Sequence, residues 1–223
     1  LVLGYSTFPK ARDFLTRISI FDTLFSAIQF MGFAISGNAY MGFSTNLAYK
    51  KELFFNNKGF ASHLYLNSGE DDLFIEEISS SDNTRIAVNS ESKIVVHKDN
   101  VWEFWKRQRI SHFSTYAYYS IGTKIRLAFE MSSRCLFYLS FPVLVIYGII
   151  VQNPIFIFLP VALFLLRYLV QIIIVNNSGQ QLKEERFYLT IPLFDILLPI
   201  VKFLLWVNHL FQRNNDFTRR VLR

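Results

Sequence analysis

Three consecutive acids, Glu70, Asp71 and Asp72, form the densest group of carboxylates in this sequence. Gly69 precedes them, and the apolar run Leu73-Phe74-Ile75 follows. A tight turn at the glycine would present the acids at the mouth of a site. The apolar run would then anchor the following helix in a core, so the acids are the first candidates for chemistry.

A structural role for the same acids is the alternative. Ser68 is a suitable N-cap residue, and it would place Asp71 at the third helical position. Acidic side chains in a first turn also suit the helix dipole. The pattern by itself favours this alternative, and the neighbouring stretches shift the balance toward a site.

A second group of side chains belongs to a helix predicted to begin at residue 101. Asn100 and Glu103 form a capping box at its start. The spacing i, i+3, i+7 and i+10 places four side chains on one face, with Gln108 beside them: Trp102, Trp105, Arg109 and His112. Such a face either packs its tryptophans on a core, which the pattern alone favours, or contacts sugar and phosphate.

The elements that position these residues begin with a helix over residues 11–35. Its apolar run is long enough to span a membrane. Asp22 would be costly inside a bilayer, and Arg12 and Arg17 suit lipid headgroups, so we expect the helix to lie on the membrane surface.

Residues 36–60 predict loops around a short strand and a helix. Gly42 and Asn46 allow turns, and Asn46 is positioned to cap a helix that runs to about residue 55. Turn chemistry alone explains both residues equally well. Two β-rich stretches, 84–89 and 93–97, then predict strands.

The remaining sequence predicts a membrane region. Residues 135–151 and 155–175 form two apolar segments joined by a tight turn, which indicates a transmembrane hairpin. Residues 190–211 carry Asp195, Lys202 and His209 at seven-residue intervals, so we expect this third helix to lie in the interface, with a cytoplasmic C-terminus. Because a charge within a span needs a partner, Arg167 is predicted to face the bundle and to pair with Asp195.

Composition narrows the class of protein. The chain has 223 residues, a net charge of +6 and one cysteine, which fits a reducing compartment. The basic residues lie beside apolar segments, which favours an anionic membrane surface over nucleic acid. The first residue is Leu1 in a strand-like stretch, so we expect an N-terminal part to be missing. The sequence contains no P-loop and no metal-ligand spacing of histidines.

The order of these pieces resembles a bacterial, membrane-associated family 2 glycosyltransferase, and the likeness covers essentially the whole chain. Four stretches carry it, followed by C-terminal membrane segments: residues 42–49 (GFSTNLAY), 59–60 (GF), 68–75 (SGEDDLFI) and 102–112, which ends in QRISH. The resemblance implies an α/β fold of GT-A type, with residues 1–132 as the acceptor half of the catalytic domain and residues 133–223 as the membrane region.

The resemblance also implies an activity and its residues. Asp71 would be the general base of an inverting transfer, which takes the proton of the acceptor hydroxyl while the nucleotide diphosphate leaves from the other face. The residues implied to bind the acceptor and diphosphate are Glu70, Asp72, Gln108, Arg109, His112, Trp105 and Asn46. The implied cofactor is Mg²⁺ or Mn²⁺, bound mainly by an Asp-x-Asp motif that this sequence does not contain.

The implied partners are a nucleotide-sugar, a lipid or glycan acceptor and membrane lipids, at the cytoplasmic face of a bacterial inner membrane. One motif departs from the family pattern Gln-x-x-Arg-Trp, because Ser111 and His112 stand at its last two positions, and Arg109 can substitute for the missing charge. This departure favours single-sugar transfer over polymer synthesis. Two other classes stay open: a catalytically silent membrane scaffold, and a transporter or channel subunit, for which three apolar segments are few.

Overall fold

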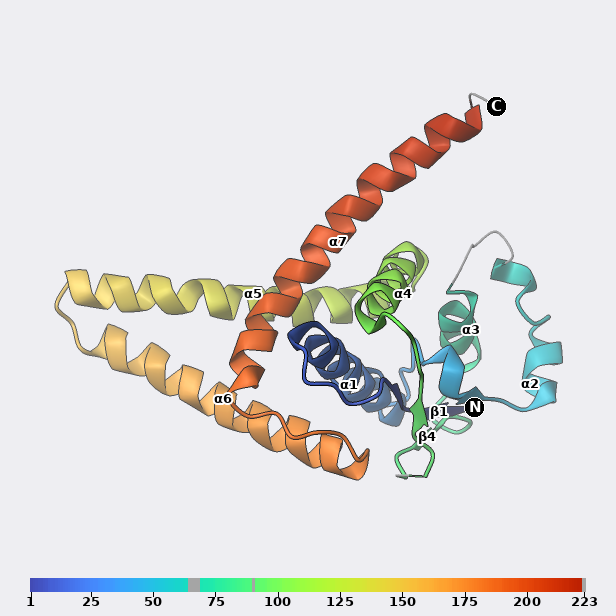
Figure 1. Ribbon diagram of the computed structural model, residues 1–223, viewed down its shortest axis with the longest axis horizontal. Coiled ribbons are helices and arrows are strands. Elements are labelled where there is room, and N and C mark those ends of the chain that lie inside the picture. The colour runs from blue at the N-terminus through green and yellow to red at the C-terminus, as the bar shows by residue number, and fades with distance from the viewer. Residues whose placement is uncertain (64–68, 90, 222–223) are drawn as a thin grey trace.

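The computed structural model describes residues 1–63, 69–89 and 91–221, and helices dominate it (Figure 1). Helices contain 67% of the residues and strands only 6%. The predicted α/β architecture, a partial GT-A fold, is therefore wrong. The β-rich stretches form strands of two or three residues, which are too short to build a sheet with helices on both faces. The long apolar runs form helices of 22 to 32 residues instead.

The strands form two small sheets near the chain start. They are β1 (Val2–Gly4), β2 (Ser6–Thr7), β3 (Leu47–Ala48), β4 (Arg85–Ala87) and β5 (Ile94–Val95). In the first sheet, β1 lies between β3, which is antiparallel to it, and β4, which is parallel. In the second, β2 pairs in parallel with β5. These pairings hold the first residues against three strands that lie much later in the chain.

Helix α1 (Phe14–Ile35) is the centre of the core. Asp13 caps it by accepting a hydrogen bond from the backbone N–H of Thr16 at 2.8 Å. Of its most apolar stretch, 67% is buried inside the protein, against 11% for α5 (Ile121–Ile150) and 6% for α6 (Ile155–Gln181). The expected membrane-surface helix is thus a core helix, which packs against α4, α6 and α7.

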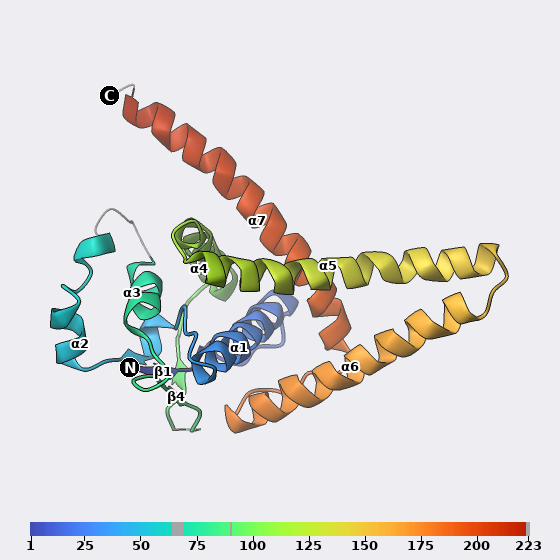
Figure 2. The ribbon, with the colours of Figure 1, turned by 180° about the vertical axis from the view of Figure 1, so that it is seen from behind.

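Helices α5 and α6 form a long hairpin that projects from the rest of the protein, and α7 (Thr190–Val221) crosses its open end (Figures 1 and 2). The predicted segments 135–151 and 155–175 fall on this hairpin, but α5 begins at Ile121, before the expected boundary near residue 132. Four described helices are long and apolar enough to cross a membrane: α1, α5, α6 and the first part of α7. These helices support a membrane protein.

A charged cluster joins the three C-terminal helices. Asp195 of α7 is only 1% exposed, and its Oδ2 accepts hydrogen bonds from Arg167 at 3.0 Å, Gln171 at 2.7 Å and Tyr138 at 2.6 Å. Arg134 of α5 lies 3.4 Å from the other carboxylate oxygen. The predicted pairing of Arg167 with Asp195 is confirmed, and it explains how apolar helices accommodate an arginine.

The shorter helices form the part of the chain that carries the acids. They are α2 (Lys51–Asn56), α3 (Glu70–Ile78), α4 (Val101–Tyr116) and two single 3₁₀ turns, η1 (Ser44–Asn46) and η2 (Ala61–His63). Helix α2 begins at Lys51, so Asn46 does not cap it. Asn100 does cap α4, as expected, because its Oδ1 accepts from the Glu103 N–H at 3.0 Å.

Candidate functional site

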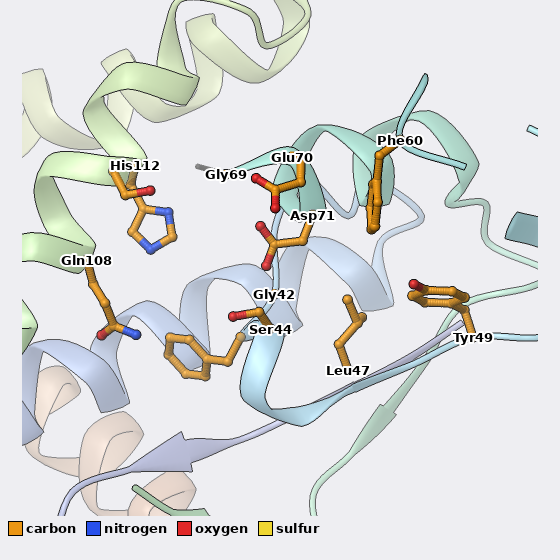
Figure 3. A pocket seen from close by; sticks show the side chains of 12 residues that line it. Gly42, Ser44, Leu47, Tyr49, Phe60, Gly69, Glu70, Asp71, Gln108 and His112 are labelled. Atoms are coloured by element: carbon orange, nitrogen blue, oxygen red, sulfur yellow. The ribbon is translucent and has the colours of Figure 1, made fainter. Parts of the chain in front are cut away.

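A pocket of about 450 Å³ opens between α3, α4 and the segment from residue 42 to residue 60 (Figure 3). Twelve residues line it: Gly42, Phe43, Ser44, Leu47, Tyr49, Phe60, Gly69, Glu70, Asp71, Gln108, Ser111 and His112. Every one of them belongs to the four stretches on which the family resemblance rests. The structure therefore brings together segments that lie up to seventy residues apart.

The turn before α3 brings the acids to this pocket. Gly69 has φ +86°, a left-handed conformation, and a Cβ at this position would clash with the hydroxyl group of Thr115. Only glycine meets both demands without strain. Leu73, Phe74 and Ile75 are buried behind the first turn, which holds the helix so that Glu70 and Asp71 line the pocket. The proposed N-cap, Ser68, lies outside the described residues.

Asp71 is the acid best placed for chemistry. Its carboxylate lies on the pocket wall beside Glu70 (Figure 3). Burial raises the pKa of Asp71 to about 6, the neighbouring carboxylate of Asp72 acts in the same direction, and His112 opposes the shift. A carboxyl group with a pKa near neutrality can accept a proton and release it again at physiological pH.

Asp72 faces away from the pocket and is buried, with 1% of its surface exposed. Its Oδ2 lies 2.8 Å from His112 Nδ1 and accepts a hydrogen bond from the Tyr119 hydroxyl at 3.3 Å. Burial, followed by repulsion from Asp72, raises the pKa of Tyr119 well above its ordinary value, so the phenol keeps its proton and donates. The three consecutive acids therefore have different surroundings, although the sequence groups them.

Helix α4 presents two different faces to the rest of the protein. Gln108, Ser111 and His112 face the pocket. Trp105 and Arg109 lie on another face and contact α1 instead. The sequence placed Trp105, Arg109 and His112 on one side of the helix, but the structure separates His112 from the other two.

The partner of Trp105 and Arg109 is Asp22, which is fully buried. Asp22 Oδ2 accepts from Trp105 Nε1 at 3.0 Å and lies 2.7 Å from Arg109 Nε. Lys202 of α7 reaches the other oxygen at 2.6 Å. Arg109 and Trp105 thus connect α4 to α1 and do not line the pocket.

Asn46 also has a role in the backbone framework. Its amide nitrogen donates to the carbonyl of Tyr5 at 2.8 Å and to that of Ser92 at 2.6 Å. Gly4 makes room for this amide, since a Cβ there would clash with it. Asn46 therefore ties the residue between β1 and β2 to the segment that precedes β5, and it does not line the pocket.

An aromatic wall completes the site. Tyr49 and Phe60 lie at the end of the pocket opposite His112 and Gln108 (Figure 3). Phe54 stacks on Tyr49 with ring centroids 5.8 Å apart, which fixes the tyrosine ring. Phe43 is a third aromatic residue of the lining, and none of the three was predicted from the sequence as a site residue. Their only signal was their position in the stretches that carry the resemblance.

The site also lies beside a membrane helix. Glu76 in the second turn of α3 accepts hydrogen bonds from the side chains of Ser120 at 2.8 Å and Thr123 at 2.6 Å. Ser120 is the N-cap of α5. The helix that carries the acids is thereby fastened to the first turn of the hairpin.

Comparisons with known proteins identify no relative. A scan against protein-family models, a search of curated proteins and a search of solved structures each found no match. The family resemblance therefore stays a prediction from sequence.

A divalent metal would need a set of donor side chains close together. Among the described residues, no three histidine, cysteine or acidic side chains lie together in a way that could hold an ion. Asp72 is engaged by His112 and Tyr119, which leaves Glu70 and Asp71 as the acids that line the pocket. These residues do not form a complete metal site, and the expected Mg²⁺ or Mn²⁺ stays a prediction.

Proposed function

We propose that this chain provides the acceptor site of a membrane-bound glycosyltransferase, with Asp71 as the general base. The observation that carries the proposal is the pocket itself. It places a carboxyl group with a pKa of about 6 opposite an aromatic wall. Sugar rings suit such a site, because their C–H faces pack on aromatic rings while their hydroxyl groups donate to carboxylates.

In the proposed reaction, Asp71 takes the proton of an acceptor hydroxyl group. The oxygen forms a bond to the anomeric carbon of a nucleotide-sugar, and the bond from that carbon to the diphosphate breaks, with its electron pair leaving on the diphosphate. The configuration at the anomeric carbon inverts. Glu70 and Gln108 supply further hydrogen bonds to the acceptor, and Tyr49 and Phe60 support its ring.

The setting favours an acceptor held in a membrane. Glu76 joins α3 to the start of α5, so the pocket lies close to the base of an apolar hairpin. A lipid or lipid-linked glycan could present its hydroxyl group from the bilayer surface. Because nucleotide-sugars are made in the cytoplasm, the pocket belongs on the cytoplasmic face, in a bacterial inner membrane.

A transfer assay with the protein in its native membrane tests this proposal. Membranes are incubated with radiolabelled nucleotide-sugars, and label is counted in the lipid extract. Asp71→Asn should lower the transfer rate by about a hundredfold or more, since a general base contributes about 10²–10⁴. Asp82→Asn is the matched control, because Asp82 is an exposed acid outside the pocket, and its rate should equal the wild-type rate. Absence of transfer from every donor would instead support the scaffold hypothesis.

A further inference from the structure

The Asp72–His112 pair has a property that a simple link between helices would not need. Asp72, which is only 1% exposed, has its Oδ2 atom 2.8 Å from His112 Nδ1. A histidine that served only to link α3 to α4 would need no more than this contact. Yet the histidine side chain is 24% exposed, and it lines the pocket across from Asp71 and Glu70 (Figure 3).

The partner on Nδ1 determines what the other ring nitrogen can do. A carboxylate only accepts hydrogen bonds, so the imidazole nitrogen facing it carries the hydrogen. In the neutral ring, Nε2 then holds a lone pair and acts as an acceptor. Tyr119 donates to the same oxygen of Asp72 at 3.3 Å, which holds the carboxylate in this orientation.

The pocket wall formed by α3 and α4 therefore consists mostly of acceptors. The carboxylates of Glu70 and Asp71 and the imidazole of His112 all line it, and the Gln108 amide and the Ser111 hydroxyl are the neighbouring groups that can also donate. A ligand that matches this wall must donate several hydrogen bonds. Neighbouring hydroxyl groups on a sugar ring or another polyol have that chemistry.

We propose that His112 determines acceptor specificity: Asp72 fixes the tautomer in which Nε2 accepts a hydrogen bond from a second hydroxyl group, next to the one that Asp71 deprotonates. This inference rests on the proposed transferase function for its ligand. The acceptor must then carry two neighbouring hydroxyl groups, and an acceptor that lacks the second one binds less tightly.

The tautomer is tested first, without any substrate. Diethyl pyrocarbonate acylates an imidazole nitrogen that holds a lone pair, and mass spectrometry of peptides gives the rate at each histidine in the reconstituted protein. His97, which is exposed, is the internal standard. His112 should be labelled, and Asp72→Asn should lower its rate relative to His97 roughly threefold or more, because an amide no longer fixes one tautomer. Tyr119→Phe keeps the carboxylate and should change the rate less than about twofold.

Specificity is tested in the transfer assay with increasing amounts of lipid extract as acceptor. His112→Gln should raise KM for the acceptor about five- to tenfold and change kcat less, as expected for one lost hydrogen bond in binding. An unlabelled His112 in the wild type, a labelling rate unchanged by Asp72→Asn, or an unchanged KM in His112→Gln would each overturn the inference. If no transfer occurs while His112 labels as expected, the transferase proposal and the sugar ligand fail, and the Asp72–His112 tautomer stands.

Discussion

Arg167 in α6 and Asp195 in α7 lie 3.0 Å apart within the helices that are apolar enough to cross a membrane. Asp195 also accepts from Tyr138 and Gln171, so the carboxylate is the centre of the cluster and Arg167 is one of several partners. Removal of the carboxylate should therefore harm the protein more than removal of any one donor.

A double-mutant cycle measures this relationship. Asp195→Asn should destabilise the protein by about 3 kcal/mol or more, because Arg167 then loses its counter-charge and Arg134 keeps only its ion pair with Glu130. Arg167→Gln should cost less, and the double variant should cost less than the sum by about 0.5–3 kcal/mol. Tyr138→Phe is the control that removes a hydrogen bond but no charge. Strict additivity in thermal unfolding of the reconstituted protein would argue against the pairing.

The Asp71 carboxyl group should reduce stability at neutral pH. Its pKa of about 6 in the folded protein exceeds the ordinary value of 3.8, so the folded state binds more protons than the unfolded state between these values. Stability contributed by this group is complete below about pH 4 and is lost as the pH rises through 6. Asp71→Asn should thus stabilise the protein by about 1–2 kcal/mol above pH 7, allowing for partial solvent screening, and have no such effect near pH 4.

The same substitution separates function from stability. If Asp71→Asn melts at a higher temperature than the wild type at pH 8 but transfers no sugar, the Asp71 carboxylate lowers stability and is needed for activity. The transfer rate of the wild type should also fall as the pH drops through about 6, since Asp71 becomes protonated. A melting temperature that is equal for both proteins at pH 8 would contradict the raised pKa.

The turn at Gly69 should tolerate no side chain. Gly69→Ala meets a left-handed backbone and the Thr115 hydroxyl, so we expect a loss of about 1–3 kcal/mol. Gly32→Ala is the matched control: it lies inside α1, where an added Cβ would have no neighbour within 4 Å, and alanine should stabilise that helix by up to about 1 kcal/mol. Combining Gly69→Ala with Thr115→Ala should recover only the steric part of the loss. A neutral Gly69→Ala would show that the turn adapts.

Two kinds of feature were predictable from the sequence: local motifs such as helix caps, and ion pairs of charged residues within apolar helices. Asn100 caps its helix because the cap motif needs no tertiary information. Arg167 finds Asp195 because a charge among apolar helices has few alternatives. The pocket contains three predicted site residues, Asp71, Gln108 and His112. Asp71 lies in the first turn of α3, and Gln108 and His112 lie on the face of α4 that lines the pocket.

The overall architecture and several partners could not be predicted in this way. A β-rich stretch such as residues 84–89 does not reveal that only three residues will pair. The partner of Arg109 is Asp22, which lies 87 positions earlier and was assigned to a membrane surface. Asp72 resembles Asp71 in sequence, and only the packing of α3 against α4 separates a buried carboxylate from one that lines the pocket.

The distribution of charge predicts how the chain lies in the membrane. Lys124, Arg126 and Arg134 precede the tip of the hairpin, Lys183 and Arg186 follow it, and residues 135–166 carry no charge. By the positive-inside bias, we expect the basic ends to face the cytoplasm and the tip near Asn153 to face outward. The pocket, which is fastened to the start of α5, then lies on the cytoplasmic side.

Cysteine labelling tests this orientation directly. The chain has one cysteine, Cys135, so Cys135→Ser gives a background without thiols. In intact spheroplasts, Asn153→Cys should react with a membrane-impermeant maleimide, whereas Lys183→Cys and Lys98→Cys should react only after permeabilisation. The exposed Asn208→Cys tests α7, which should also react only after permeabilisation if that helix lies in the inner interface. Labelling of Lys98→Cys from outside would place the pocket away from cytoplasmic nucleotide-sugars, and it would exclude the proposed reaction even if the topology of the hairpin were otherwise correct.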